Sequence, residues 1–188
     1  MVTLLLRQLS GALMKHFHPD TFRNCTLGLL LGRAALLKDR IIDTHMEPYG
    51  ITAAQFKVLI IMAQYAVDTP AELCRHLSLD SGSMTRMLDR LEQKNLLIRQ
   101  RSEADRRQVR LVLTDDGLAL ADELPIIGTN AMNQLAGEIS PQELQTLEDI
   151  LKKILLAAGD PITIMRLGEK RSPAIIAGGA VQLIIVCL

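Results

Sequence analysis

The chain has 188 residues, of which 48% are hydrophobic, 22% charged and 3% aromatic, a size and composition that suit one compact domain and exclude a disordered or collagen-like chain. Its 21 basic and 21 acidic residues cancel, but residues 75–110 carry nine basic and five acidic side chains (net +4), whereas residues 115–160 carry two and nine (net −7). This division excludes a uniformly neutral surface and indicates that one face binds an anionic partner.

The first half of the chain has the apolar period of α-helices. One helix is predicted from about residue 26 to residue 46, and the Pro-Tyr-Gly sequence at residues 48–50 ends it. Thr52-Ala-Ala-Gln55 is a capping box that opens a second helix, and Thr69-Pro-Ala-Glu72 opens a third, short helix. Ser78-Leu-Asp-Ser81 ends that helix and caps a fourth, which we expect from about residue 82 to residue 94.

The period then changes to that of strands. Residues 97–101 and 109–113 are predicted as two strands joined by a polar loop. Thr114 caps an acidic helix to about Gln134, with a bend allowed at its internal proline, and Ser140 opens a last helix through another capping box. The apolar residues of this last helix follow alternating spacings of three and four, as in a coiled coil: Leu144, Leu147, Leu151, Ile154 and Ala158.

A short helix, a turn, a second helix and a basic hairpin form the layout of a winged helix-turn-helix. In that fold the second helix lies in the major groove of DNA, and its exposed N-terminal residues contact base edges. The helix over 82–94 directs its methionines and leucines to the core. The hydroxyls and arginines left outside can donate to phosphates and to guanine: Ser81, Ser83, Thr85, Arg86 and Arg90.

The hairpin offers a second basic surface. It contains five arginines against two acidic residues: Arg99, Arg101, Arg106, Arg107 and Arg110. The turn with Arg106 and Arg107 is short enough for an arginine to enter a minor groove, where narrow A·T-rich tracts concentrate negative potential. We therefore predict a protein that binds double-stranded DNA through a helix in the major groove and an arginine wing in the minor groove.

Three segments resemble the multiple-antibiotic-resistance regulator (MarR) family: residues 51–59 (ITAAQFKVL), 85–91 (TRMLDRL) and 105–114 (DRRQVRLVLT). The resemblance extends from about Leu27 to Ala158. It implies a mainly α fold, a winged helix-turn-helix with a small antiparallel β-hairpin as the wing and long dimerisation helices. It also implies a homodimeric transcription factor, usually a repressor, that binds a pseudo-palindromic operator and is released by a small aromatic carboxylate or phenolic effector.

The same resemblance assigns roles to individual residues. It places Ser83, Thr85, Arg86 and Arg90 on the recognition helix, and Arg106 and Arg107 at the wing tip. The first and last helices would form the dimer interface, in agreement with the coiled-coil spacing: Leu30, Leu144, Leu147, Leu151 and Ile154. The effector crevice of the family lies between the dimer helices and the DNA-binding lobe. The candidate contacts there are His16, His18, Arg23, Arg33 and Met62. Met62 is more simply explained as a residue of the hydrophobic core.

We expect five segments along the chain. They are an N-terminal extension (1–18), an N-terminal dimerisation helix (19–50), the winged helix-turn-helix lobe (51–114), C-terminal dimerisation helices (115–160) and an apolar tail of unknown role (161–188). Gly159-Asp160-Pro161 is expected to end the folded domain. The uncharged run Ser172–Leu188 is at the lower limit of a membrane span and is interrupted by Gly-Gly and Gln, so no stable membrane association is expected.

Other site chemistries are weakly supported. Cys25, Cys74 and Cys187 are odd in number and form no C-x-x-C, which favours a reducing cytoplasm over a disulfide framework or a zinc site. His16-Phe-His18-Pro-Asp20 imitates a metal motif at a segment boundary, and only two further histidines exist, so we expect no metal and no cofactor.

Two alternatives to the simple regulator remain open. Cys25 is a candidate peroxide sensor, as in one branch of the family, but it lies about three residues too early, and an incidental cysteine is the simpler interpretation. The chain lacks a phosphate-binding glycine loop, a nucleophile elbow and an acid–base pair, so an enzyme is not expected. The alternative of another class is a winged-helix protein-interaction module, tethered to a membrane by Ser172–Leu188.

Overall fold

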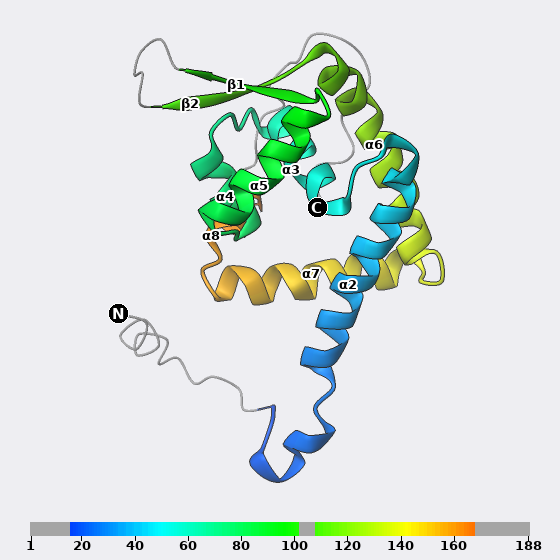
Figure 1. Cartoon of the computed structure of the whole chain (residues 1–188). Helices are drawn as coiled ribbons and strands as arrows, with labels where there is room; N and C mark the ends of the chain where they lie inside the picture. Colours follow the sequence, from blue (N-terminus) through cyan, green and yellow to red (C-terminus); the bar gives the residue numbers. More distant parts are fainter. Residues whose placement is uncertain (1–15, 102–107, 168–188) are drawn as a thin grey trace. The chain divides into compact units, whose positions relative to one another are not determined.

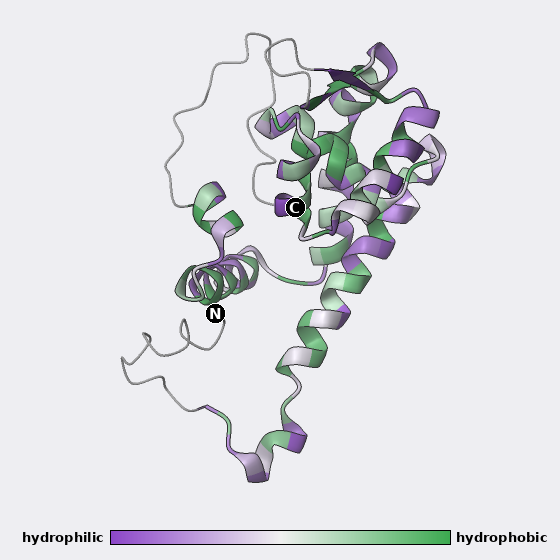
Figure 2. Cartoon of the chain, turned by 60° about the vertical axis from the view of Figure 1, so that its left-hand side comes forward, coloured by the Kyte–Doolittle hydropathy of each residue, from purple (hydrophilic) through white to green (hydrophobic). Residues whose placement is uncertain are grey.

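The computed structural model describes residues 16–101 and 108–167 (Figure 1). Its contacts divide the chain into two units, residues 1–36 and 37–188. The described part of the first unit contains the 3₁₀ helix η1 (Pro19–Asn24) and the first half of α2 (Leu27–Met46). This half of α2 is rich in leucine (Figure 2), and its large apolar side chains are exposed: Leu27, Leu29, Leu30, Leu31 and Leu36.

Helix α3 (Ala53–Tyr65) forms the centre of the second unit. The predicted capping box is confirmed: the Thr52 hydroxyl accepts from the Gln55 amide (3.3 Å), and the Gln55 side chain accepts from the Thr52 amide (3.0 Å). Eight of the 13 residues of α3 are buried, among them Phe56 and Leu59 at 0% exposure. A helix buried on nearly all sides is a core helix, and the neighbouring elements pack around it.

The predicted helix-turn-helix and hairpin are confirmed. Helices α4 (Pro70–Leu77) and α5 (Ser81–Gln93) are followed by strands β1 (Leu97–Arg101) and β2 (Val109–Leu113). The strands pair antiparallel, with Leu97 opposite Leu113 and Arg101 opposite Val109. Leu73 of α4 and three residues of α5 fill the space between these helices and α3: Met84, Leu88 and Leu91, each at most 1% exposed.

Helix α6 (Asp115–Ala136) begins against the loop that precedes β1. Thr114 caps it by accepting from the Gly117 amide (3.1 Å), and the Thr114 hydroxyl donates to the Asn95 carbonyl (2.5 Å). A Cβ atom on Gly117 would lie 1.9 Å from the Leu96 carbonyl oxygen. Only glycine permits this approach, which seats α6 beside the hairpin. The helix continues without interruption through Pro125.

The C-terminal part of the described chain consists of α7 (Pro141–Ala157) and α8 (Pro161–Leu167). The predicted Ser140 capping box of α7 is confirmed, and α7 contains no buried residue. The expectation that Gly159-Asp160-Pro161 ends the folded domain is wrong, because the same three residues end one helix and open another. Gly159 takes the left-handed conformation (φ 69°), and Asp160 accepts from the Thr163 amide (2.7 Å) as a cap for α8.

Candidate nucleic-acid interface

The turn between α4 and α5 holds the start of α5 in a defined conformation. Ser78 ends α4 in the left-handed conformation (φ 53°), and Asp80 caps α5 by accepting from the Ser83 hydroxyl (2.7 Å) and the Ser83 amide (2.8 Å). These hydrogen bonds hold the pKa of the Asp80 carboxyl below its usual value. The carboxylate therefore stays ionised at neutral pH and stabilises the positive end of the helix.

The predicted DNA contacts of α5 share one side of the helix. Arg86 and Arg90 are exposed, and so are Ser81 and Thr85, whereas Ser83 is half-buried. The hydroxyls are used within the helix: Thr85 donates to the Ser81 carbonyl (2.8 Å), and the Ser83 oxygen accepts from Arg86 Nη2 (3.0 Å). Because the opposite side of α5 is buried in the core, this side is the one that a duplex can reach.

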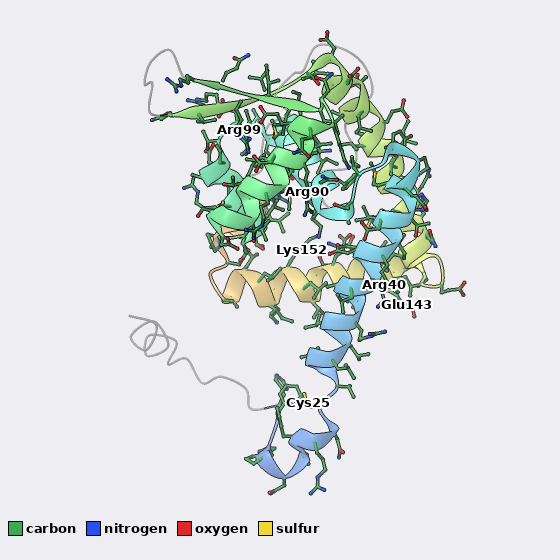
Figure 3. The ribbon with its side chains drawn as sticks, viewed as in Figure 1. Cys25, Arg40, Arg90, Arg99, Glu143 and Lys152 are labelled. Atoms are coloured by element: carbon green, nitrogen blue, oxygen red, sulfur yellow. The ribbon has the colours of Figure 1, made fainter. Side chains whose placement is uncertain are left out.

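A pocket of about 220 Å³ lies between the start of α3 and the exposed side of α5. It is lined by Thr52, Ala54, Gln55, Ser83, Arg86, Met87 and Arg90. Neither of its two arginines forms an ion pair with any residue that the structure describes (Arg90 is labelled in Figure 3). Two guanidinium groups without carboxylate partners form an anion-binding surface.

Two of the five hairpin arginines are bound within the protein rather than available to DNA. Arg99 Nη1 lies 2.7 Å from carboxylate oxygens of both Asp89 and Glu92 on α5, and its Nη2 donates to the Thr85 carbonyl (3.2 Å). Arg110 Nη1 lies 2.5 and 2.6 Å from the two carboxylate oxygens of Asp68. The basic charge expected of the hairpin is therefore smaller than its arginine count suggests.

Of the three remaining hairpin arginines, one lies in the part of the chain that the structure describes. Arg101, at the end of β1, is exposed. Arg106 and Arg107, the predicted wing tip, lie outside the described residues. The middle of β2 is fixed to the α3–α4 loop, because the Leu111 amide donates to the Asp68 carbonyl (2.7 Å) next to the Arg110 ion pair. Both strands are therefore bound to the rest of the lobe at the same level, because Arg99 of β1 lies opposite Leu111.

The predicted effector contacts fall into two groups. His16, His18, Arg23 and Arg33 all belong to the first unit and are exposed there. Met62 belongs to the second unit and is buried at 7% exposure as part of the hydrophobic core, in agreement with the simpler interpretation as core filling. The pocket on α5 was not anticipated from the sequence, because its two sides are about thirty residues apart in the chain.

The predicted dimer residues are exposed in the isolated chain. Leu30 is 59% exposed on α2, and Leu147 and Ile154 are each 47% exposed on α7. Leu144 is 37% exposed, and Leu151 is half-buried. Exposed leucine and isoleucine at a coiled-coil spacing are typical of a helix that packs on a further subunit.

Sequence reasoning missed the partners of the hairpin arginines. Asp89 and Glu92 lie three residues apart on α5, so they share one side of the helix, and Arg99 follows on the adjoining strand. Opposite charges at these positions were the available signal for a contact between helix and strand.

Within residues 16–101 and 108–167, no three His, Cys, Asp or Glu side chains come together as potential metal ligands. Over the same ranges, no helix has both the length and the hydropathy needed to cross a bilayer. Ser172–Leu188 lies outside the described residues. Cys25 and Cys74 are both half-buried free thiols.

The chain matches a family of known proteins and is similar to individual members of it. Residues 51–109 match the model of the MarR family. The multiple antibiotic resistance protein MarR of Escherichia coli is 39% identical over 130 residues, which are 69% of this chain and 90% of that protein.

The solved structures that are similar to this chain include the following two. One is a point mutant of E. coli MarR complexed with operator DNA (38% identity, 72% of this chain and 97% of that one, TM-score 0.66). The other is Bordetella bronchiseptica BpsR, whose DNA binding is regulated by 6-hydroxynicotinic acid (27% identity, 68% and 91%, TM-score 0.61).

Proposed function

The chain belongs to the MarR family of transcriptional regulators, and on this basis we propose that it is a homodimeric repressor of pseudo-palindromic operators that a small aromatic carboxylate releases from DNA. The observation that carries the proposal is the exposed side of α5, where Arg86 and Arg90 stand without carboxylate partners among the described residues. Arginine donates in pairs to guanine and to phosphate, so such a helix fits the major groove.

Dimerisation follows from the exposed apolar residues of α2 and α7. The exposed leucines of α2 and the apolar stripe at coiled-coil spacing on α7 give two copies a surface to bury. Two recognition helices related by a two-fold axis then enter successive major grooves about one helical turn apart. Phosphate contacts supply most of the affinity and a steep salt dependence, while a few side chains supply sequence preference.

The pocket on α5 supports the proposed effector class. Its volume of about 220 Å³ exceeds that of the roughly 150 Å³ cavity that holds a benzene molecule, so one aromatic ring fits. A carboxylate on that ring would pair with Arg86 or Arg90 and take the place of a DNA phosphate. The effector then binds only the DNA-free form, as release by mass action requires. The contacts predicted for His16, His18, Arg23 and Arg33 stay a prediction.

The DNA proposal is tested by selecting duplexes from a random pool and measuring their affinity at several salt concentrations. We expect the selected site to be two-fold symmetric. Arg86→Ala should weaken binding by about 1–3 kcal/mol and relax the preference at one base pair of each half-site. Arg40→Ala removes the same charge from exposed α2 and serves as the control. Wild-type protein that binds no duplex in a salt-dependent manner contradicts the proposal.

The effector proposal is tested with a variant that fills the pocket. Ala54 lines the pocket from α3, and Ala54→Phe should abolish release by millimolar salicylate when the variant and the wild type are compared at equal operator occupancy. Equal occupancy is needed because the added ring lies beside Arg86 and Arg90, the proposed DNA contacts. Ala63→Phe, at an exposed position of the same helix, is the matched control and should still respond. If both variants release DNA like the wild type, the effector binds elsewhere, and the His16–Arg33 region becomes the next site to test.

A further inference from the structure

Helix α8 returns the C-terminal part of the chain to the DNA-binding lobe, which we define as residues 51–114. After the cap at Asp160, α8 buries Thr163 at 9% exposure, and its Arg166 contacts Tyr65 of α3 and His76 of α4. Figure 1 shows α8 beside α4. The family resemblance read from the sequence stops near Ala158. The contact is therefore made by a segment beyond the part of the chain that resembles the family.

Arg166, Tyr65 and His76 meet in this contact, and we call these three residues the Arg166 cluster. The guanidinium carbon of Arg166 lies 4.5 Å from the centroid of the Tyr65 ring, a distance typical of a cation–π contact. Arg166 Nη2 lies 3.3 Å from His76 Nδ1, and the two aromatic rings have centroids 6.1 Å apart. Tyr65 is the last residue of α3 and His76 lies on α4, so one guanidinium joins α8 to both helices.

We propose that Arg166 is a positioning residue for operator binding: through Tyr65 and His76 it fixes α4, the first helix of the helix-turn-helix, relative to α7. This role rests on the proposed function. α7 carries the proposed dimer contacts and α4 precedes the recognition helix, so a fixed angle between them fixes the recognition helix relative to the two-fold axis. A lobe that is already oriented loses less freedom when DNA binds, and the affinity is correspondingly higher.

The charges around His76 make this contact depend on pH. His76 faces Arg166 from α8 and Tyr65 from α3, with Glu72 and Arg75 on its own helix. Burial, followed by the positive charge of Arg166, lowers the pKa of His76. The neutral ring accepts from the guanidinium, since a guanidinium can only donate.

The direction of the pH effect follows from that depressed pKa. The ring binds a proton more weakly when α8 is docked than when it is released, so protonation favours release. Docking is complete above the ordinary histidine pKa of about 6.5 and weakens as the pH falls below it. Non-specific electrostatics has the opposite sign, because protonated histidines strengthen attraction to DNA.

Docking is tested first without DNA, by hydrogen exchange of the peptide that covers α8 in the full chain. At pH 7.5, Arg166→Ala should lower the protection of this peptide about tenfold, whereas Lys153→Ala, at an exposed position on α7, should not change it. Between pH 7.5 and 5.5, after correction for intrinsic exchange, protection should fall in the wild type and stay constant in His76→Gln. Equal protection in Arg166→Ala and wild type overturns the proposal.

Operator binding is the second readout. Arg166→Ala should weaken operator affinity about three- to tenfold with an unchanged salt slope, because Arg166 orients the lobe and contacts no phosphate. Arg166→Lys should restore part of the affinity. Raised exchange with unchanged affinity overturns the positioning role. A wild type that binds no duplex overturns the proposed function as well, and the exchange result then shows separately whether α8 is docked.

Discussion

Helices α3 and α7 begin with the same local signal and end in opposite environments. Both open with a capping box, at Thr52 and at Ser140. Eight residues of α3 are buried, whereas α7 has none in its 17 residues. A capping box determines where a helix begins, but it carries no information about what covers the helix. The lobe around α3 is complete within one chain, and α7 presents an apolar side that a single chain leaves uncovered.

The apolar side of α7 has the composition of a buried surface. Leu144, Leu147, Ile150 and Ile154 are between 37% and 52% exposed. Burying an aliphatic side chain of this kind contributes about 1.5–3 kcal/mol, so a row of them is a strong driving force for association. In the proposed dimer, α3 therefore contributes stability within one subunit, whereas α7 contributes stability through contact with the second subunit.

The largest expected effect comes from charging the apolar side of α7. Leu147→Glu combined with Ile154→Glu should convert the protein to monomers and reduce operator affinity at least about a hundredfold, since each half-site must then be bound alone. Light scattering gives the mass, and circular dichroism should show an unchanged helix content. Lys153→Glu adds negative charge to α7 without removing an apolar side chain and should remain dimeric. A double variant that is still a dimer places the interface elsewhere.

The second prediction concerns the packing of α6 against the DNA-binding lobe, at Gly117. Gly117→Ala puts a methyl group against the Leu96 carbonyl and should destabilise folding by about 1–3 kcal/mol. Gly128→Ala is the matched control in the same helix, because a Cβ there would meet Phe56 at 3.5 Å, an ordinary contact. It should be neutral or slightly stabilising. Urea denaturation measures both, and equal midpoints would show that α6 shifts to accommodate the methyl group.

The elements of the lobe could be read from the sequence because their signals are local. Both strands match their predicted ranges, and the caps at Thr52, Thr114 and Ser140 are confirmed. The prediction that the folded domain ends at Gly159-Asp160-Pro161 was wrong because the local signal there has two meanings. A glycine that ends a helix, followed by a capping aspartate and a proline, also begins the next helix, and only the contacts of Arg166 show that α8 packs on the lobe.

The residues of the candidate site could be predicted from the sequence, but the ion pairs that its arginines form could not. The exposed side of α5 follows from the helical period, so Arg86 and Arg90 could be assigned to it. The pairing of Arg99 with α5 and of Arg110 with Asp68 depends on how the hairpin packs, and composition counts every arginine equally. The pocket similarly requires two segments, about thirty residues apart in the chain, to meet at the surface.

The smallest expected effect distinguishes the roles of Arg99 and Arg101, which both lie on β1. Arg99 is held by Asp89 and Glu92, whereas Arg101 is exposed. Arg101→Ala should weaken operator binding a few-fold and lower the salt slope by about one, the amount expected when one phosphate contact is lost. Arg99→Gln combined with Asp89→Asn keeps the net charge; it should weaken binding through a loosened wing and leave the slope unchanged. A slope that falls by one in this double variant would mean that Arg99 exchanges its carboxylate partners for phosphate when DNA binds.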